Sequence, residues 1–133
     1  MSSDERLIRT DLKAHDWVNG LTIQEVVREL VAMLDVPTVA VIGGVKEARA
    51  VQQWMTDREP QRPHVLRFAL QVAAMLSNAA DREFAKAWFH SPNPRLDDRV
   101  PMFILRDVPL EKVQGSMLEA ARAFARRNET AGE

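Results

Sequence analysis

The chain has 133 residues, of which 46% are hydrophobic and 28% are charged, and its formal net charge is −1. This balance predicts a folded domain with a packed core and excludes a chain that is disordered along its whole length. The absence of cysteine excludes disulfides and thiolate metal sites, and no apolar run reaches the length of a membrane span, so we expect a cytoplasmic protein.

Charge is distributed unevenly along the chain. Residues 1–35 carry a net charge of −3, residues 36–76 carry +2, and residues 77–133 carry zero. The middle segment is therefore the only basic one. A small local excess of this kind is compatible with modest contact to nucleic-acid phosphates, and it is equally common on ordinary solvated faces.

The first helix is expected after a polar N-terminal arm. Residues 1–20 show no sustained periodicity, so we predict a flexible arm there. Thr22 and Glu25 then have the spacing of a capping box, in which each side chain accepts a hydrogen bond from the other residue's backbone N–H. Apolar residues recur at helical spacing from Ile23 to Leu34, which predicts an amphipathic helix.

Residues 37–42 are expected to form a second, short helix. Pro37 suits the first helical position, and Gly43-Gly44 can end the helix. The β-branched content of this segment mildly favours a strand, but no second strand is predicted with which it could pair. We therefore predict a helix.

A third helix, with a polar outer face, is expected from Val45 to Met55. Val51 and either Trp54 or Met55 would face inward, and the outward side chains include Arg and Gln, which pair well with guanine and adenine edges. A short helix, a glycine turn and a polar-faced helix together form the layout of a helix-turn-helix. The same side chains would equally suit a solvent-facing helix, and both interpretations remain open. The candidate DNA-binding residues are Lys46, Arg49, Gln52, Gln53 and Arg58.

The segment 36–63 resembles the Xre/Cro-type helix-turn-helix. In that pattern a Gly-Val turn precedes the recognition helix, which ends in Trp and is followed by an Arg-x-Pro-like exit. The resemblance implies that the helix after the turn is a recognition helix. The matching residues are Gly44, Val45, Trp54, Arg58, Glu59 and Pro60.

The second half of the chain is organised around a bend. Pro63 is expected to open a long helix to about Asn78, which joins the two halves, and the next helix carries Trp88. That helix must stop at the Ser-Pro-Asn-Pro sequence of residues 91–94, because proline lacks an N–H donor and pushes the preceding residue out of the α region. Pro101 then starts another apolar helix, so we predict a bent helix–loop–helix.

This bend resembles the C-terminal toxin-binding domain of the Xre/MbcA/ParS antitoxin family. In the family pattern a Trp-containing helix is followed by Pro-Asn-x-x-Leu, a glycine-containing turn and a Pro-led, Leu-rich helix. The turn departs from the pattern because Asp97-Asp98 stands where glycine is usual, although Asp adopts left-handed conformations more readily than most residues. The matching residues are Trp88, Pro92, Asn93, Leu96, Pro101, Ile104 and Leu105.

The resemblance implies an antitoxin that pairs with a toxin encoded beside it. In many members of the family the toxin is a RES-domain enzyme that consumes NAD, and the antitoxin inhibits it by occluding the entrance to its active site. The resemblance also implies binding to operator DNA, usually as a homodimer, and autorepression of the operon. The alternative is a stand-alone helix-turn-helix transcriptional regulator without a toxin partner.

Aromatic, Met and Arg side chains crowd near the bend, and these types are enriched at protein interfaces. Two helices cannot expose every apolar side chain, so about half of these should belong to the core. We expect Trp88 to support the bend from inside, and Phe89 and Met102 to lie at the surface. The candidate toxin-binding residues are Phe89, Asn93, Arg95, Arg99, Met102, Phe103 and Arg106.

Together these patterns predict an all-α bundle of about six to seven helices. We divide it into a flexible arm (1–20), an Xre-like helix-turn-helix domain (21–78) and a toxin-binding domain (79–133), with a last helix starting near Pro109. An enzyme is not expected, because the chain has no Cys or Tyr, its three histidines lie in separate segments, and no Gly-rich phosphate loop is present. No cofactor or metal ion is expected.

Overall fold

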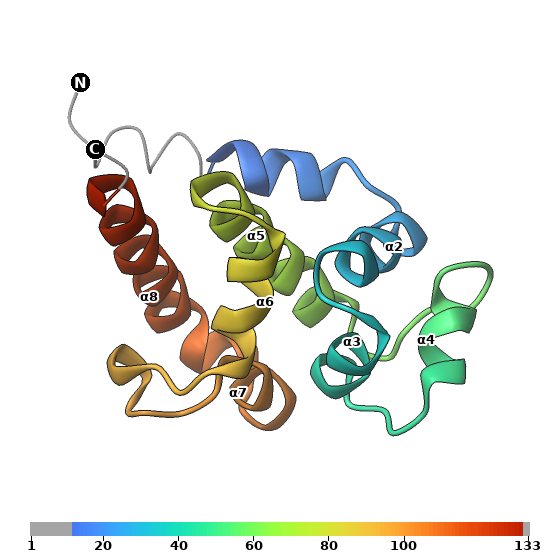
Figure 1. Cartoon of the computed structure of the whole chain (residues 1–133). Coiled ribbons are helices and arrows are strands. Elements are labelled where there is room, and N and C mark those ends of the chain that lie inside the picture. Colours follow the sequence, from blue (N-terminus) through green and yellow to red (C-terminus); the bar gives the residue numbers. More distant parts are fainter. Residues whose placement is uncertain (1–11, 132–133) are drawn as a thin grey trace.

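The computed structural model describes residues 12–131, which form an all-α bundle without a β-strand in that range (Figure 1). The predicted fold class is therefore confirmed. None of the described helices combines the length and apolarity needed to cross a membrane. After a helical segment over residues 12–19, the elements are α2 (Ile23–Met33), α3 (Val36–Gly43), α4 (Ala48–Trp54), α5 (Pro63–Ala79), α6 (Arg82–His90), the 3-10 turn η1 (Pro94–Leu96), α7 (Pro101–Asp107) and α8 (Leu110–Ala131).

The boundaries of α2 and α3 follow local capping chemistry. The side chain of Thr22 accepts a hydrogen bond from the N–H of Glu25 at 3.1 Å, and the Glu25 carboxylate accepts one from the N–H of Thr22 at 2.8 Å, which is the predicted capping box. α3 ends in a Schellman motif, in which Gly44 has a φ of 79° and the N–H of Val45 donates to the carbonyl of Ala40. The segment after Pro37 is thus a helix, as predicted, despite its β-branched residues.

Residues 12–19 form a helix rather than part of a flexible arm. Ala14 and Val18 lie one helical turn apart and are both buried. Arg67 of α5 donates a hydrogen bond to the carbonyl of Val18 at 3.0 Å, which ties this helix to the bundle. The predicted arm is wrong here because two small buried residues form too short a stripe for periodicity to reveal. Residues 1–11 of that arm lie outside the described residues.

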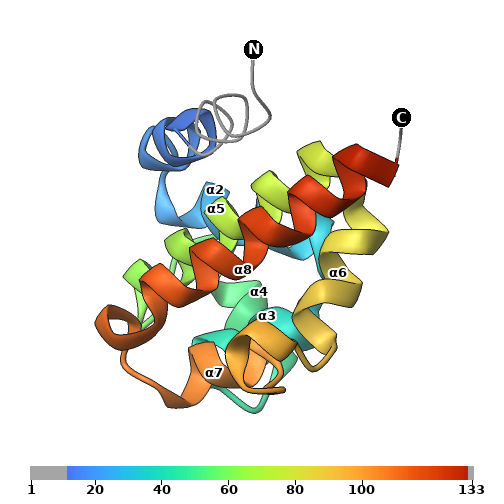
Figure 2. The same cartoon turned by 90° about the vertical axis from the view of Figure 1, so that its left-hand side faces the viewer.

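The long helix α5 occupies the centre of the bundle (Figures 1 and 2). It packs against α2 from the first half of the chain and against α6 and α8 from the second half, and Figure 2 shows α8 lying along it. Almost every side chain between Val65 and Leu76 is buried as a result. One hydrophobic core therefore runs from Ala14 to Ala121, and the boundary that we predicted after residue 78 falls in the last turn of α5.

Polar contacts tie the first turn of α3 to α6. Asp35 caps α3 by accepting a hydrogen bond from the N–H of Thr38, and its carboxylate pairs with Lys86 at 2.8 Å. The hydroxyl of the buried Thr38 lies 2.8 Å from Nε2 of His90. Burial raises the pKa of Asp35, but the hydrogen bonds from Lys86 and Thr38 outweigh it and hold the pKa below its ordinary value. This carboxylate therefore stabilises the fold above its ordinary pKa, and the contribution is lost as the pH falls through the lowered value.

Candidate partner-binding surface

The loop between α6 and α7 is held in shape by Asn93. Its N–H donates to the carbonyl of Arg99 at 3.0 Å, and its carbonyl accepts from the N–H groups of Leu96 and Asp98, both at 2.9 Å. Its side-chain oxygen accepts a hydrogen bond from the N–H of Arg95, also at 2.9 Å. Asn93, a candidate toxin-binding residue, is therefore placed to order the loop that presents its neighbours.

Asp97 and Asp98 are in the left-handed conformation, with φ values of 57° and 58°. These two residues stand where the resembled pattern has glycine. The left-handed region brings Cβ close to the following carbonyl oxygen and costs a residue other than glycine on the order of 1 kcal/mol, somewhat less for Asp than for most residues. The turn thus keeps a glycine-like backbone without glycine and carries strain at both positions.

Relieving this strain is expected to stabilise the protein. We predict that Asp98→Gly raises the free energy of unfolding by up to about 1 kcal/mol, and that Asp98→Ala lowers it by a similar amount. Urea denaturation followed by circular dichroism measures both changes. A glycine variant less stable than the natural chain would show that the Asp98 side chain stabilises the turn by more than its backbone strain costs.

Phe89 is fully buried, which corrects our expectation that it lies at the surface. Its side chain has 0% exposure, and its ring packs edge-on against Trp88, with the ring centroids 5.2 Å apart. Trp88 is 5% exposed and supports the bend from inside, as predicted. The position of Phe89 was misassigned because α6 is covered by more than one neighbour, α5 and α7 among them, so that two adjacent positions are buried.

Arg62 joins the two halves of the chain, although no pattern in the sequence singles it out. Its Nη1 donates to the carbonyls of Ile42 at 3.3 Å and Arg106 at 3.1 Å, and its Nη2 donates to the carbonyl of Leu105 at 2.8 Å. The last carbonyls of a helix have no partner within the helix, so one guanidinium caps the ends of both α3 and α7. No local pattern marks such a residue, because its partners lie 20 to 44 positions away.

α7 presents an exposed aromatic ring beside guanidinium groups. Phe103 is 39% exposed, and the guanidinium carbon of Arg106 lies 4.8 Å from the centre of its ring, a cation–π arrangement. Arg106 also donates two hydrogen bonds to Asp107, and these bonds, together with the charges of Arg99 and Arg62, hold the pKa of Asp107 below its ordinary value. We define the α7 patch as Arg99, Phe103 and Arg106.

The remaining candidate toxin-binding residues lie elsewhere. Met102 is half-buried against the hydrophobic core. Arg95 is exposed, but it lines a small cavity of about 80 Å³ beside α8, together with Phe124 and Arg127. The structure therefore places Phe103 and Arg106 together, buries Phe89, packs Met102 against the core, and puts Asn93 and Arg95 at the cavity beside α8.

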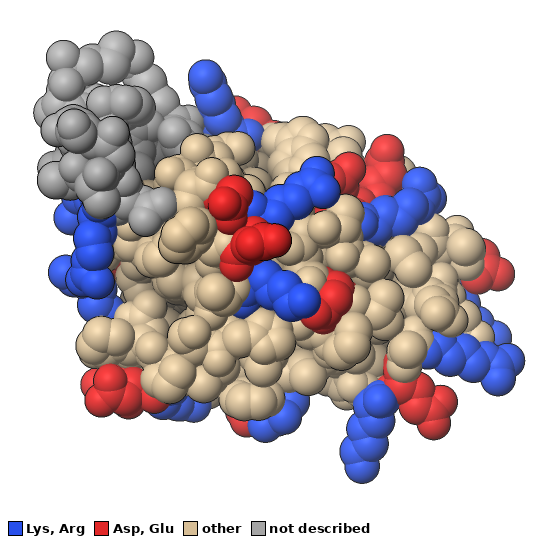
Figure 3. Space-filling model, in the orientation of Figure 1, with Lys and Arg blue, Asp and Glu red and all other residues tan. Residues whose placement is uncertain are grey.

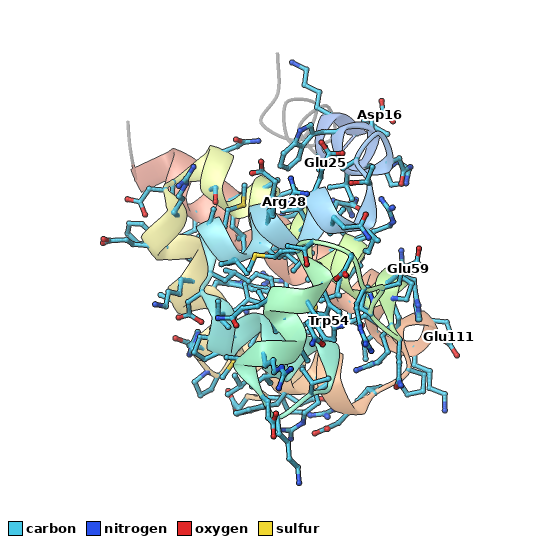
Figure 4. All side chains as sticks on the ribbon, turned by 90° about the vertical axis from the view of Figure 1, so that its right-hand side faces the viewer. Asp16, Glu25, Arg28, Trp54, Glu59 and Glu111 are labelled. Carbon is cyan, nitrogen blue, oxygen red and sulfur yellow. The ribbon has the colours of Figure 1, made fainter. Side chains whose placement is uncertain are left out.

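α4 is shorter than the predicted recognition helix. It spans Ala48–Trp54, so Lys46 lies in the preceding turn, because the Schellman motif after α3 uses the first residue of the predicted helix. Trp54 faces inward beneath α4 (Figure 4) and packs so closely on Gly43 that a Cβ there would lie 2.7 Å from its ring. Arg28 of α2, also labelled in Figure 4, donates to a backbone carbonyl at the C-terminal end of α4 at 2.9 Å.

The side chains around α4 carry both signs of charge. Glu47, Asp57 and Glu59 are exposed among the basic residues, and on the face shown in Figure 3 blue and red groups are interspersed. Such a surface attracts phosphates only weakly. Of the candidate DNA-binding side chains, Gln53 is partly buried, and the exposed ones are Lys46, Arg49, Gln52 and Arg58.

Comparison with known proteins identifies no relative. No protein-family model, curated protein or solved structure matches the chain. The described side chains, residues 12–127, include no group of three or more His, Cys, Asp or Glu placed to hold a metal ion.

Proposed function

We propose that this protein is a cytoplasmic antitoxin that binds and inhibits a toxin encoded beside it through the α7 patch. The observation that carries the proposal is the exposed Phe103 ring with the Arg106 guanidinium over it, with the exposed Arg99 four positions earlier in the chain. Aromatic and Arg side chains are the types that dominate binding energy at interfaces. The sequence resemblance of the bend to antitoxin toxin-binding domains supports the same function and favours a RES-domain, NAD-consuming toxin.

The support beneath the patch suits tight binding. The loop before α7 is fixed by the hydrogen bonds of Asn93, and the end of α7 is fixed by Arg62. A surface that is ordered before it binds loses less conformational entropy on association. Arg99 and Arg106 can pair with carboxylates on the toxin through two parallel hydrogen bonds each.

A stand-alone helix-turn-helix regulator is the second candidate. The exposed Arg49 and Gln52 on α4, after the Gly44 turn, favour it. A homodimeric antitoxin that represses its own operon would use the same side chains. DNA binding alone therefore does not separate the two functions, whereas neutralisation of a toxin does.

The proposal is tested by co-expressing the chain with the protein of the adjacent reading frame in growing cells. We expect the natural chain to restore growth and Phe103→Asp to fail, because a carboxylate replaces the ring beneath the Arg106 guanidinium and should weaken binding by roughly a hundredfold. Phe84→Asp is the matched control, since Phe84 is also exposed, at 48%, and each phenylalanine is the third residue of its helix, α6 or α7.

Equal neutralisation by both variants would remove the α7 patch from the toxin contact. Failure of the natural chain itself, combined with binding to its promoter fragment, would favour the stand-alone regulator. Circular dichroism of the purified variants verifies that each remains helical.

A further inference from the structure

A groove opens between the helix-turn-helix segment and the end of α7. Its volume is about 930 Å³, and its lining comes from α3, the turn after Gly44, the start of α4 and two arginines outside that segment. Most of the lining is apolar. The residues that supply this apolar surface include Pro37, Ala40, Val41, Val45 and Ala48.

The polar part of the groove is cationic. Lys46, Arg62 and Arg106 contribute to the lining, and no acidic residue does. Arg62 directs its side-chain hydrogen bonds to neutral backbone carbonyls, and no carboxylate among the described side chains, residues 12–127, lies within ion-pair distance of Arg62 or Lys46. Arg106 pairs with Asp107, whose carboxylate also interacts with the charge of Arg62. Three cationic side chains thus line the groove and no acidic one does.

We propose that this groove binds an acidic segment of a partner protein, with apolar side chains on its floor and carboxylates at Lys46, Arg62 and Arg106. Charge complementarity favours the carboxylates, and burial of apolar side chains favours a peptide over a nucleic-acid backbone, which would leave the apolar floor unused. The proposal does not require that the partner be a toxin. It shares only Arg106 with the α7 patch.

The test uses the full chain labelled with ¹⁵N and two synthetic peptides. One alternates Glu and Leu, and the other alternates Glu and Ser. We expect the Glu-Leu peptide to shift the amide resonances of Ala40, Val41 and Ala48 and the Glu-Ser peptide to leave them nearly unchanged. Lys46→Glu should weaken binding of the Glu-Leu peptide roughly tenfold, because it places a like charge at the rim.

Lys13→Glu is the matched control, since it makes the same change of charge at an exposed position on the helical segment 12–19, outside the groove lining. The affinity of the Lys13→Glu variant for the Glu-Leu peptide should stay within about twofold of that of the natural chain. Absence of peptide binding, equal shifts from both peptides, or equal weakening by both substitutions would overturn the proposal. The proposal would also be overturned, in favour of phosphate binding, if a short DNA duplex shifted the amide resonances of the groove residues more than the Glu-Leu peptide does.

Discussion

Phe89→Ala should lower the free energy of unfolding by about 3–5 kcal/mol, as expected when a large buried aromatic side chain is truncated. The Phe89 side chain has no solvent exposure and packs edge-on against Trp88. Phe103→Ala removes the same atoms from a side chain that is 39% exposed, and it should cost less than about 1 kcal/mol. Urea denaturation of the two variants, run in parallel, measures the difference.

The pair of variants separates a core role from a surface role. Similar small losses of unfolding free energy in both variants would mean that Phe89 is not in the core. Phe89 would then again be a candidate toxin-contact residue. A large loss for Phe89→Ala alone would mean that any failure to bind a partner arises from unfolding.

Arg62→Met should have the second-largest effect, a loss of about 2–3 kcal/mol. The substitution keeps much of the side-chain volume but leaves the carbonyls of Ile42, Leu105 and Arg106 without their donor. Arg62→Lys should be intermediate, because an ammonium keeps the charge without the planar fork that reaches two helix ends. Thermal and urea denaturation measure the losses.

Arg58→Met provides the control for Arg62→Met. Arg58 is exposed and lies four positions earlier, so its replacement should change the free energy of unfolding by less than about 0.5 kcal/mol. If the two variants were equally stable, the guanidinium of Arg62 would not be joining α3 to α7.

The features that the sequence predicted correctly are those decided by neighbouring residues. The capping box of Thr22 and Glu25, the glycine stop of α3 and the proline-led starts of α5 and α7 each depend on a few adjacent positions. Helix propensity and capping act over that distance. The all-α class followed because every capping and proline signal favoured a helix and no second strand was predicted for the β-branched segment to pair with.

The features that it missed depend on residues far apart in the chain. The burial of Phe89 requires α5 and α7 to cover α6 from more than one side, and the role of Arg62 requires α3 and α7 to end at the same place. Sequence periodicity shows which face of a single helix is apolar. How much of that helix is buried depends on how many other helices pack against it, which periodicity does not reveal. The sequence therefore identified an exposed aromatic and arginine surface near the bend but included a core residue, Phe89, in it.

The enclosure of α5 by helices from both halves makes the chain a single thermodynamic unit. Neither half buries its share of α5 without the other, so we expect α4 and α7 to unfold in the same cooperative transition. A ligand that binds only the folded state stabilises every part of such a unit by the same amount. Occupation of the surface around α4 would thus protect α7 from unfolding and proteolysis, and occupation of α7 would protect α4, without any change of shape in either.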